Sequence, residues 1–103
     1  GPSLSAAQFP DVRDDLDAEA RLLSQARSAM RAGNPGQALA LLDQGQARFH
    51  AGALHEESAA TRVFALCQLG RSADARAAST SFVRRFPTSP LSTRVRDACA
   101  GKP

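Results

Sequence analysis

The sequence repeats itself at a spacing of 37 residues, and this spacing limits the possible folds more than any other feature. The matched positions include turn glycines, small residues and aromatic or apolar residues near helix ends: Gly33 with Gly70, Ala38 with Ala75, Ala40 with Ala77, Arg48-Phe49 with Arg85-Phe86, and Leu54 with Leu91. A period in the thirties is typical of stacked repeats that are each built from two helices. One such unit cannot bury its apolar face alone, so neighbouring units pack together. The spacing therefore predicts an all-α fold of stacked, antiparallel helix pairs.

The helical spacing of apolar residues and the positions of turn residues divide the chain into five expected helices. Their expected ranges are about 16–33, 35–49, 54–69, 72–86 and 90–100. Gly33 ends the first helix, because glycine readily adopts the backbone conformation that closes a helix. Asn34 and Ser72 are expected to cap the second and fourth helices, because their side chains can accept backbone N–H groups. Pro87 ends the fourth helix.

The chain is expected to form one domain preceded by a tail. Residues 1–13 lack helical periodicity and are expected to be flexible, while residues 14–103 form the repeat domain. Gly1-Pro2 resembles the remnant left when a protease removes an expression tag. A chain of 103 residues is about the size of one ordinary domain. No apolar run approaches the roughly 18 residues of a membrane-spanning helix, so this fragment is not expected to contact a membrane.

The pattern of small residues, glycine and proline resembles that of tetratricopeptide repeats. In that family small residues lie where the two helices of a repeat cross, glycine often closes the first helix, and proline often follows the second. The residues that carry this resemblance are Ala26, Gly33 and Ala38 in the first repeat, and Val63, Gly70, Ala75 and Pro87 in the second. The resemblance implies two degenerate repeats over about residues 18–100, with Ser92–Ala100 as a terminal capping helix.

The chain departs from the family's pattern in three ways. Its spacing of 37 residues exceeds the family's period of about 34. The Trp and Tyr usual in the first helix are replaced by Leu22 and Ala29, and in the second repeat by Ala59 and Leu66. His50 stands where proline is usual after the second helix. The repeats are therefore described as degenerate.

Cys67 and Cys99 are the two cysteines of the chain. Each lies on the apolar side of its expected helix, and the resemblance places both helices in the first-helix position of successive repeats. Helices in that position run side by side, which would bring the two residues near the separation of about 4.4–6.8 Å between Cα atoms that a disulfide needs. A disulfide and a pair of buried, reduced thiols are both open interpretations of the sequence.

Enzymatic chemistry, metal binding and nucleic-acid binding are not expected from this sequence. His50 and His55 lie near Glu56 and Glu57, but their spacing matches no common zinc pattern. The sequence contains neither a phosphate-binding glycine loop nor a serine-hydrolase motif, and no cofactor is expected. The net charge of +3 is not gathered with aromatic residues into a face suited to nucleic acid.

Binding of a protein partner or a peptide is the expected function. Helical repeats present a concave groove lined by the first helix of each repeat, where peptides or partner helices dock. Polar residues on the first and third helices are the candidates for such a groove: Gln25, Arg27, Arg31, Arg62 and Gln68. Each of them is equally compatible with an ordinary exposed position on a helix.

We expect a non-enzymatic interaction domain of a larger bacterial protein, on the periplasmic side of a membrane. The segment Arg84–Leu91 resembles a turn found in bacterial envelope tetratricopeptide proteins, and that resemblance implies this location. Two alternatives are open. One is self-association as a homodimer through an uncovered end of the stack, and the other is a cytoplasmic regulatory adaptor of a transcription or signalling protein.

Overall fold

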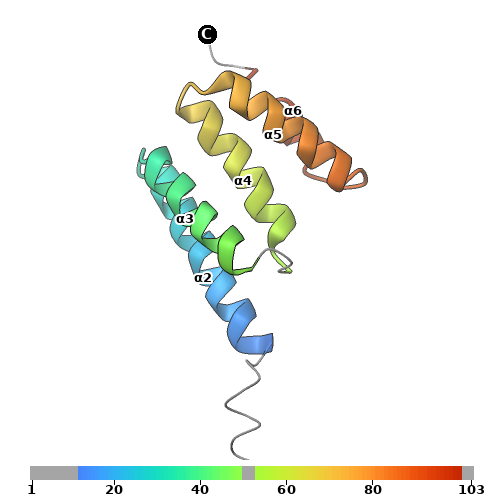
Figure 1. Ribbon diagram of the computed structural model, residues 1–103. Helices are drawn as coiled ribbons and strands as arrows, with labels where there is room; N and C mark the ends of the chain where they lie inside the picture. Colours follow the sequence, from blue (N-terminus) through green and yellow to red (C-terminus); the bar gives the residue numbers. More distant parts are fainter. Residues whose placement is uncertain (1–11, 50–52, 101–103) are drawn as a thin grey trace, which may run out of the picture.

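The computed structural model describes residues 12–49 and 53–100, and within these ranges the chain is all-helical and has no strand. The helices are α2 (Val12–Arg31), α3 (Pro35–Arg48), α4 (His55–Gln68), α5 (Ser72–Arg85) and α6 (Ser92–Arg96). Short turns join α2 to α3 and α4 to α5, so the two helices of each pair run in opposite directions (Figure 1). Helix α4 packs against both α3 and α5 and thereby joins the two pairs. In the described part of the chain no helix is both long and apolar enough to span a bilayer.

The spacing of 37 residues recurs in the helix boundaries and in the turns. Helices α3 and α5 have 14 residues each, and their first residues, Pro35 and Ser72, are 37 positions apart. The turn before each of them contains a glycine with positive φ, 80° at Gly33 and 75° at Gly70. The residue after each glycine donates its N–H to the last turn of the preceding helix, over 2.8 Å from Asn34 to the Ala29 carbonyl and over 3.0 Å from Arg71 to the Leu66 carbonyl. These bonds satisfy carbonyls that a helix end leaves open, and the predicted role of the two glycines is confirmed.

Small buried residues lie where the paired helices cross. Ala26 of α2 and Ala38 of α3 are both 0% exposed. At the equivalent positions of the second pair, Val63 of α4 and Ala75 of α5 are each 1% exposed. Because short side chains add little bulk, the two helices of a pair can pack closely without a void between them.

Helix α4 contributes to two apolar clusters on its two sides. Ala65 packs into a cluster that is otherwise formed by α2 and α3, and this cluster includes Leu23 and Leu42. Val63 belongs to the other cluster, together with Phe82 of α5 and other buried side chains of α4, α5 and α6. The two helix pairs therefore share α4 as the common wall of their cores.

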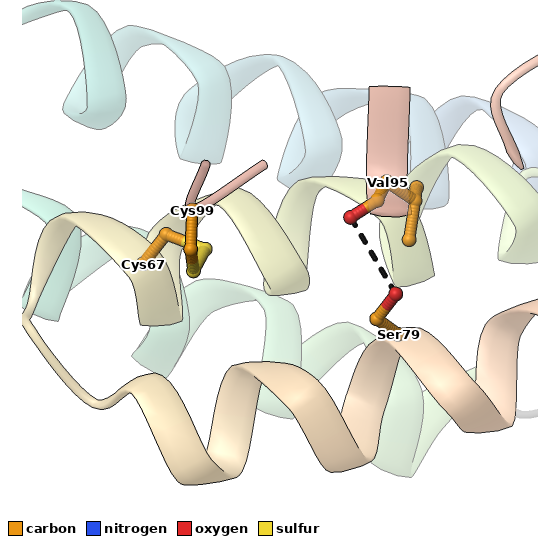
Figure 2. Close-up of a disulfide and its surroundings, with 4 residues drawn as sticks. All are labelled: Cys67, Ser79, Val95 and Cys99. Carbon is orange, nitrogen blue, oxygen red and sulfur yellow. Dashed lines mark hydrogen bonds between the residues drawn. A yellow bond between two sulfur atoms is a disulfide. The ribbon is translucent and has the colours of Figure 1, made fainter. Parts of the chain in front are cut away.

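A disulfide joins Cys67 of α4 to Cys99, which follows α6 (Figure 2). The two Cα atoms are 5.3 Å apart, within the range that disulfides require. Val95 of α6 is buried, and its carbonyl accepts a long hydrogen bond of 3.5 Å from the Ser79 hydroxyl. Because a helix of five residues is too short to be stable alone, these contacts hold α6 in place. Of the two interpretations open for the cysteines, the structure shows the disulfide.

The predicted boundaries at the start of the chain were wrong by a few residues. Helix α2 begins at Val12, inside the predicted tail of residues 1–13, and the rest of that tail lies outside the described residues. Asp14 and Asp15 lie in the first turn of α2, where negative charge favours the positive end of the helix dipole. Helix α2 therefore starts before Asp14 and Asp15 and not after them.

The predicted cap position of α3 is confirmed, whereas the cap position of α5 and the side-chain capping bonds were predicted wrongly. Asn34 occupies the cap position of α3, but its side chain makes no capping hydrogen bond. Ser72 is the first residue of α5, and Arg71 occupies the cap position before it. In both places the cap residue's backbone carbonyl accepts the N–H four residues later, from Ala38 and Ala75 respectively. Each of these is the ordinary first bond of the helix, and neither helix has a side-chain cap on the N–H groups of its first turn.

The terminal helix is shorter than the predicted 90–100. It spans Ser92–Arg96, and the chain turns from Asp97 onward. Continued helix would carry residue 99 along the helix axis, whereas the turn brings Cys99 back to Cys67. The turn of the chain after Arg96 therefore both ends α6 and places Cys99 for the disulfide.

Replacing Gly33 by alanine is expected to destabilise the domain by about 1–2 kcal/mol, because the left-handed backbone conformation is costly for residues that carry a Cβ. Gly36 lies in α3 with open space around the position of a Cβ, and it is the matched control. Gly36→Ala is expected to stabilise by about 0.4–1 kcal/mol, because alanine restricts the unfolded chain more than glycine does. Urea unfolding followed by circular dichroism measures both changes. Equal effects of the two substitutions would contradict the role of the Gly33 turn.

Reduction of the disulfide is expected to lower the free energy of unfolding by about 3–4 kcal/mol, because Cys67 and Cys99 close a loop with a sequence separation of 32 residues. The measurement is the urea midpoint with and without dithiothreitol. The variant Cys67→Ala/Cys99→Ala should lose similar stability and should not respond to the reductant. Two titratable thiols in the unreduced, unfolded protein would show that the bond does not form.

Candidate functional site

Residues of α2, α3, α4 and α5 line a groove. Helices α3 and α5 form its two walls, and α4 lies between these helices (Figure 1). The volume of the groove is about 200 Å³. The described residues that line it come from α2 to α5 and from the positions after α3 and α5: Glu19, Leu22, Leu23, Leu41, Leu42, Gly45, Gln46, Phe49, His55, Ser58, Ala59, Arg62, Ala78, Ser81, Phe82, Arg85 and Phe86. Most of these side chains are apolar, so the groove offers a surface for apolar groups of a ligand. We refer to it as the α3–α5 groove.

At the base of this groove, large and small side chains occupy different positions in the two halves of the chain. Leu22 of α2 lies against Gly45 of α3, where an added Cβ would be 3.6 Å from the Leu22 Cδ1 atom. The positions 37 residues later hold Ala59 and Phe82. The large side chain is therefore on the first helix in the first pair and on the second helix in the second pair. Phe82 is buried, and Ala59 packs against the cluster that contains it. The exchange keeps both crossings filled while giving the two halves of the groove different shapes.

Aromatic side chains gather at one end of the groove. The rings of Phe82 and Phe86 have centroids 5.1 Å apart, and the His55 ring lies 5.9 Å from that of Phe86. Phe49 lines the groove from the opposite wall, at the position equivalent to Phe86 in the first repeat. Phe49 and Phe86 are both only partly buried. This end of the groove therefore presents two aromatic surfaces to a ligand.

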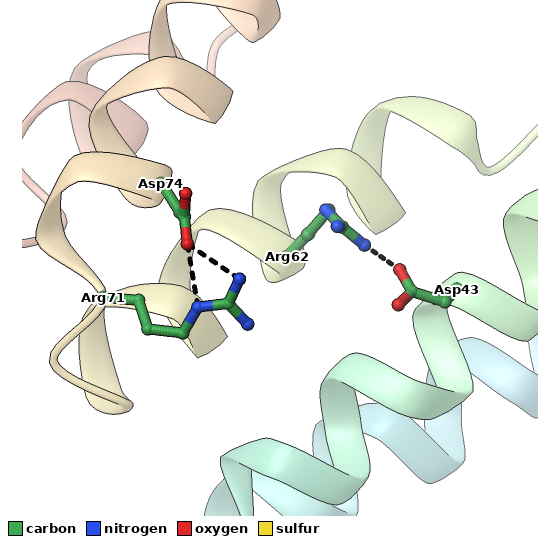
Figure 3. A network of polar contacts seen from close by, with 4 residues as sticks. All are labelled: Asp43, Arg62, Arg71 and Asp74. Carbon is green, nitrogen blue, oxygen red and sulfur yellow. Dashed lines mark hydrogen bonds and ion pairs between the residues drawn. The ribbon is translucent and has the colours of Figure 1, made fainter.

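An ion pair connects α4 to α3 at the edge of the groove. The Arg62 guanidinium donates to the Asp43 carboxylate (Figure 3). The two side chains are 35% and 53% exposed, so solvent screens the pair and it adds little to stability. Figure 3 also shows the pair Arg71–Asp74, which is local to the turn before α5 and spans 2.7 Å. Of these two pairs, Arg62–Asp43 is the one that links neighbouring helix pairs.

Two glutamates that the sequence reasoning missed attach each helix pair to the next helix. Glu19 of α2 is buried, and its carboxylate accepts the Leu54 N–H over 3.2 Å. The equivalent Glu56 accepts the Ser89 hydroxyl over 2.5 Å, and that hydroxyl oxygen in turn accepts the Leu91 N–H over 3.0 Å. Leu54 and Leu91 are also 37 residues apart, so the two carboxylates stabilise equivalent turns at two places in the chain. The signal was present in the sequence, because Glu19 and Glu56 are 37 residues apart.

The structure separates the five predicted groove residues. Arg27 and Arg31 line a second groove between α2 and the start of α4, which we call the α2–α4 groove. Arg62 lines the α3–α5 groove. Gln25 and Gln68 are exposed and line neither of these two grooves. The predicted set therefore does not form one surface, although two of its arginines lie together.

The α2–α4 groove is the more polar of the two. Besides Arg27 and Arg31 it is lined by Glu57 and by Ser24, with Leu23 and Leu54 among its apolar residues. The Arg31 guanidinium is engaged with the Ser28 hydroxyl over 3.1 Å. This groove presents charged side chains over a small apolar base, and it lacks the aromatic surface of the α3–α5 groove.

Within residues 12–49 and 53–100 no group of three His, Cys, Asp or Glu side chains is placed to hold a metal ion. Of the four residues considered for a metal site, His50 lies outside the described residues. Glu56 binds Ser89, and His55 lies in the aromatic end of the α3–α5 groove.

Comparisons with models of protein families, with curated proteins and with solved structures give no match to this chain. The chemistry open to a ligand is that of the α3–α5 groove itself, an apolar surface with arginines at its edges.

Glu19→Ala is expected to destabilise the domain by about 1–3 kcal/mol, because the partly buried Leu54 N–H loses its acceptor. Glu19→Gln retains an acceptor oxygen and should lose less. Gln25→Ala, an exposed change on the same helix, should stay within about 0.5 kcal/mol of the parent. Urea unfolding gives the stabilities, and amide hydrogen exchange at Leu54 reports the bond directly. Unchanged exchange at Leu54 in Glu19→Ala would show that the bond does not protect this turn.

Proposed function

We propose that this chain is a two-repeat, tetratricopeptide-like domain that binds a segment of a partner protein in the α3–α5 groove. The proposal assigns no catalytic step to the domain. The observation that carries it is the groove's lining, in which partly exposed apolar side chains converge from four helices, α2 to α5, and from the residues after α3 and α5: Leu22, Leu41, Phe49, Ala59, Ala78 and Phe86.

The repeat assignment is supported by the agreement between sequence spacing and backbone geometry. The glycine turns, the starts of α3 and α5, and the small residues at the helix crossings all recur after 37 residues. Helix α6 also begins 37 residues after α4, at Ser92 and His55 respectively. On this proposal α6 is a shortened copy of a first helix, and it covers the end of the stack where a third repeat would begin.

Peptide recognition suits the groove better than proton transfer does, because its polar groups serve the fold. Arg62 is paired with Asp43, and Glu19 accepts the Leu54 N–H. Both contacts connect one helix pair to the next and therefore brace the groove. An apolar surface between braced walls is pre-organised, so a ligand does not have to pay for ordering it.

The outer face of α2 gives little support to the alternative of self-association through the end of the stack. It exposes Asp14, Asp15, Asp17, Arg21, Gln25 and Ser28. Leu16 is the large apolar residue exposed on this helix, at 42%. A single exposed leucine among charged residues is ordinary for a monomer surface. We therefore favour a different protein as the partner.

We also propose that the domain acts in an oxidising compartment, such as the bacterial periplasm. The Cys67–Cys99 disulfide supports this location, because disulfides are kept reduced in most cytosols. Alkylation of free thiols in intact cells, before the protein is extracted, tests it. Two alkylated cysteines would argue for a reducing compartment.

A substitution that fills the groove is expected to abolish peptide binding. Gln46 is exposed at the wall of the groove, and Gln44 is exposed on the same helix outside it. The probe is a phage-displayed library of random 12-residue peptides selected on the parent domain. Gln46→Trp should weaken the selected peptides at least about tenfold, the loss that corresponds to about 1.4 kcal/mol, whereas Gln44→Trp should leave their affinity unchanged.

Fluorescence anisotropy of labelled peptides gives the affinities, and circular dichroism confirms that both variants fold. Failure to select any peptide, or selection only of peptides that bind both variants equally, would remove the α3–α5 groove as the binding site.

A further inference from the structure

Two arginine–phenylalanine pairs flank the α3–α5 groove at equivalent positions of its two walls. Arg48 and Arg85 are the last residues of α3 and α5. The Arg48 guanidinium carbon lies 4.8 Å from the centre of the Phe49 ring, and that of Arg85 lies 5.4 Å from the centre of the Phe86 ring. Both rings line the groove. Arg85 lines the groove itself, whereas Arg48 is connected to it through the Phe49 ring over which it lies.

A guanidinium that lies over the face of a ring can still donate hydrogen bonds through its N–H groups. An arginine face engages the ring's negative face, whereas the five N–H donors lie in the plane of the group. Arg48 and Arg85 are exposed, and within the described residues neither forms an ion pair with a carboxylate. A planar donor fork of this kind matches the two oxygens of a carboxylate.

The charge that the groove leaves uncompensated is positive. Arg62 is paired with Asp43, whereas Glu19 adds a carboxylate whose donor, the Leu54 N–H, carries no charge; the two arginines without an ion pair, Arg48 and Arg85, outnumber this one carboxylate. Arg48 and Arg85 each add a full positive charge at a helix end that carries only about half a negative charge. The two walls therefore attract anionic groups at the same end of the groove at which the phenylalanine rings offer apolar contact.

We infer that the partner segment is an acidic and apolar peptide, whose apolar side chains enter the α3–α5 groove and whose carboxylates bind Arg48 and Arg85. This inference rests on the proposed function and adds the chemistry of the partner to it. The apolar groove selects large aliphatic or aromatic side chains, and the arginine edges select Asp or Glu beside them. Each wall supplies one such arginine, so carboxylates on both sides of the apolar residue are favoured.

The test uses the same peptide library, sequenced after selection on the parent domain. Asp and Glu should be enriched next to large apolar residues. The affinity of a selected peptide should fall about threefold for Arg48→Gln or Arg85→Gln alone and about tenfold for the double variant, as expected for solvent-exposed, charge-assisted contacts. Raising the salt concentration should weaken the parent's binding and affect the double variant less.

Arg84 and Arg76 provide matched controls, because both are exposed arginines of α5 that do not line the groove. Arg84→Gln/Arg76→Gln removes the same net charge and should leave the affinity within about twofold of the parent's, since exposed charges that make no direct contact with the ligand contribute little. Circular dichroism confirms that both double variants fold.

The outcomes separate this inference from the function on which it rests. Peptides that Gln46→Trp blocks, but that carry no acidic enrichment or are indifferent to Arg48→Gln/Arg85→Gln, would overturn the acidic partner and retain the groove as a peptide-binding site. Equal losses in the two arginine double variants would attribute the effect to overall charge and would also overturn the inference. The absence of any peptide that depends on the groove would overturn both proposals.

Discussion

Burial of α4 on two sides is the constraint on which the rest of the structure depends. This helix contributes more buried residues than any other described helix, and they fall into both apolar clusters. Ala65 reaches the cluster of α2 and α3, while Val63 and Leu66 face α5 and α6. Neither helix pair encloses its apolar stripe alone, because each pair exposes one side of it. Sharing α4 buries both stripes at once, which is how stacked repeats gain stability from their neighbours.

The same arrangement creates the α3–α5 groove. Because α4 lies between them, α3 and α5 do not pack together, and their apolar residues at the edge remain partly exposed. The exchange of Leu22 and Gly45 for Ala59 and Phe82 fills the two crossings differently, so two similar repeats form an asymmetric surface. Two polar contacts, of Glu19 with the Leu54 N–H and of Arg62 with Asp43, join the first helix pair to the next. Of these, the buried glutamate contributes more stability than the solvent-screened ion pair.

Much of the fold could be predicted because it follows from local preferences and from one spacing. Gly33 and Gly70 end helices for reasons contained in a few residues, namely the freedom of glycine at positive φ. The stripes that include Ala26 and Val63 can be found from helical periodicity alone. The errors at Val12, Ser72 and Arg96 concern helix ends, where tertiary contacts compete with local signals. Asn34 and Arg71 occupy the two cap positions, and neither side chain makes a capping hydrogen bond.

The sequence by itself determined that residues 12–49 and 53–100 are helical, with five helices, and that its pattern recurs after 37 residues, because both properties are encoded by residues near one another in the chain. Only the tertiary structure decided which faces of those helices come together. It separated Arg27 and Arg31 from Arg62, joined Cys67 to Cys99, and brought Phe49 and Phe86, each with an arginine over its ring, to the two walls of one groove. The physical reason is that the direction of a side chain depends on how its helix rotates and crosses against a distant one, and long-range packing of α4 sets that rotation.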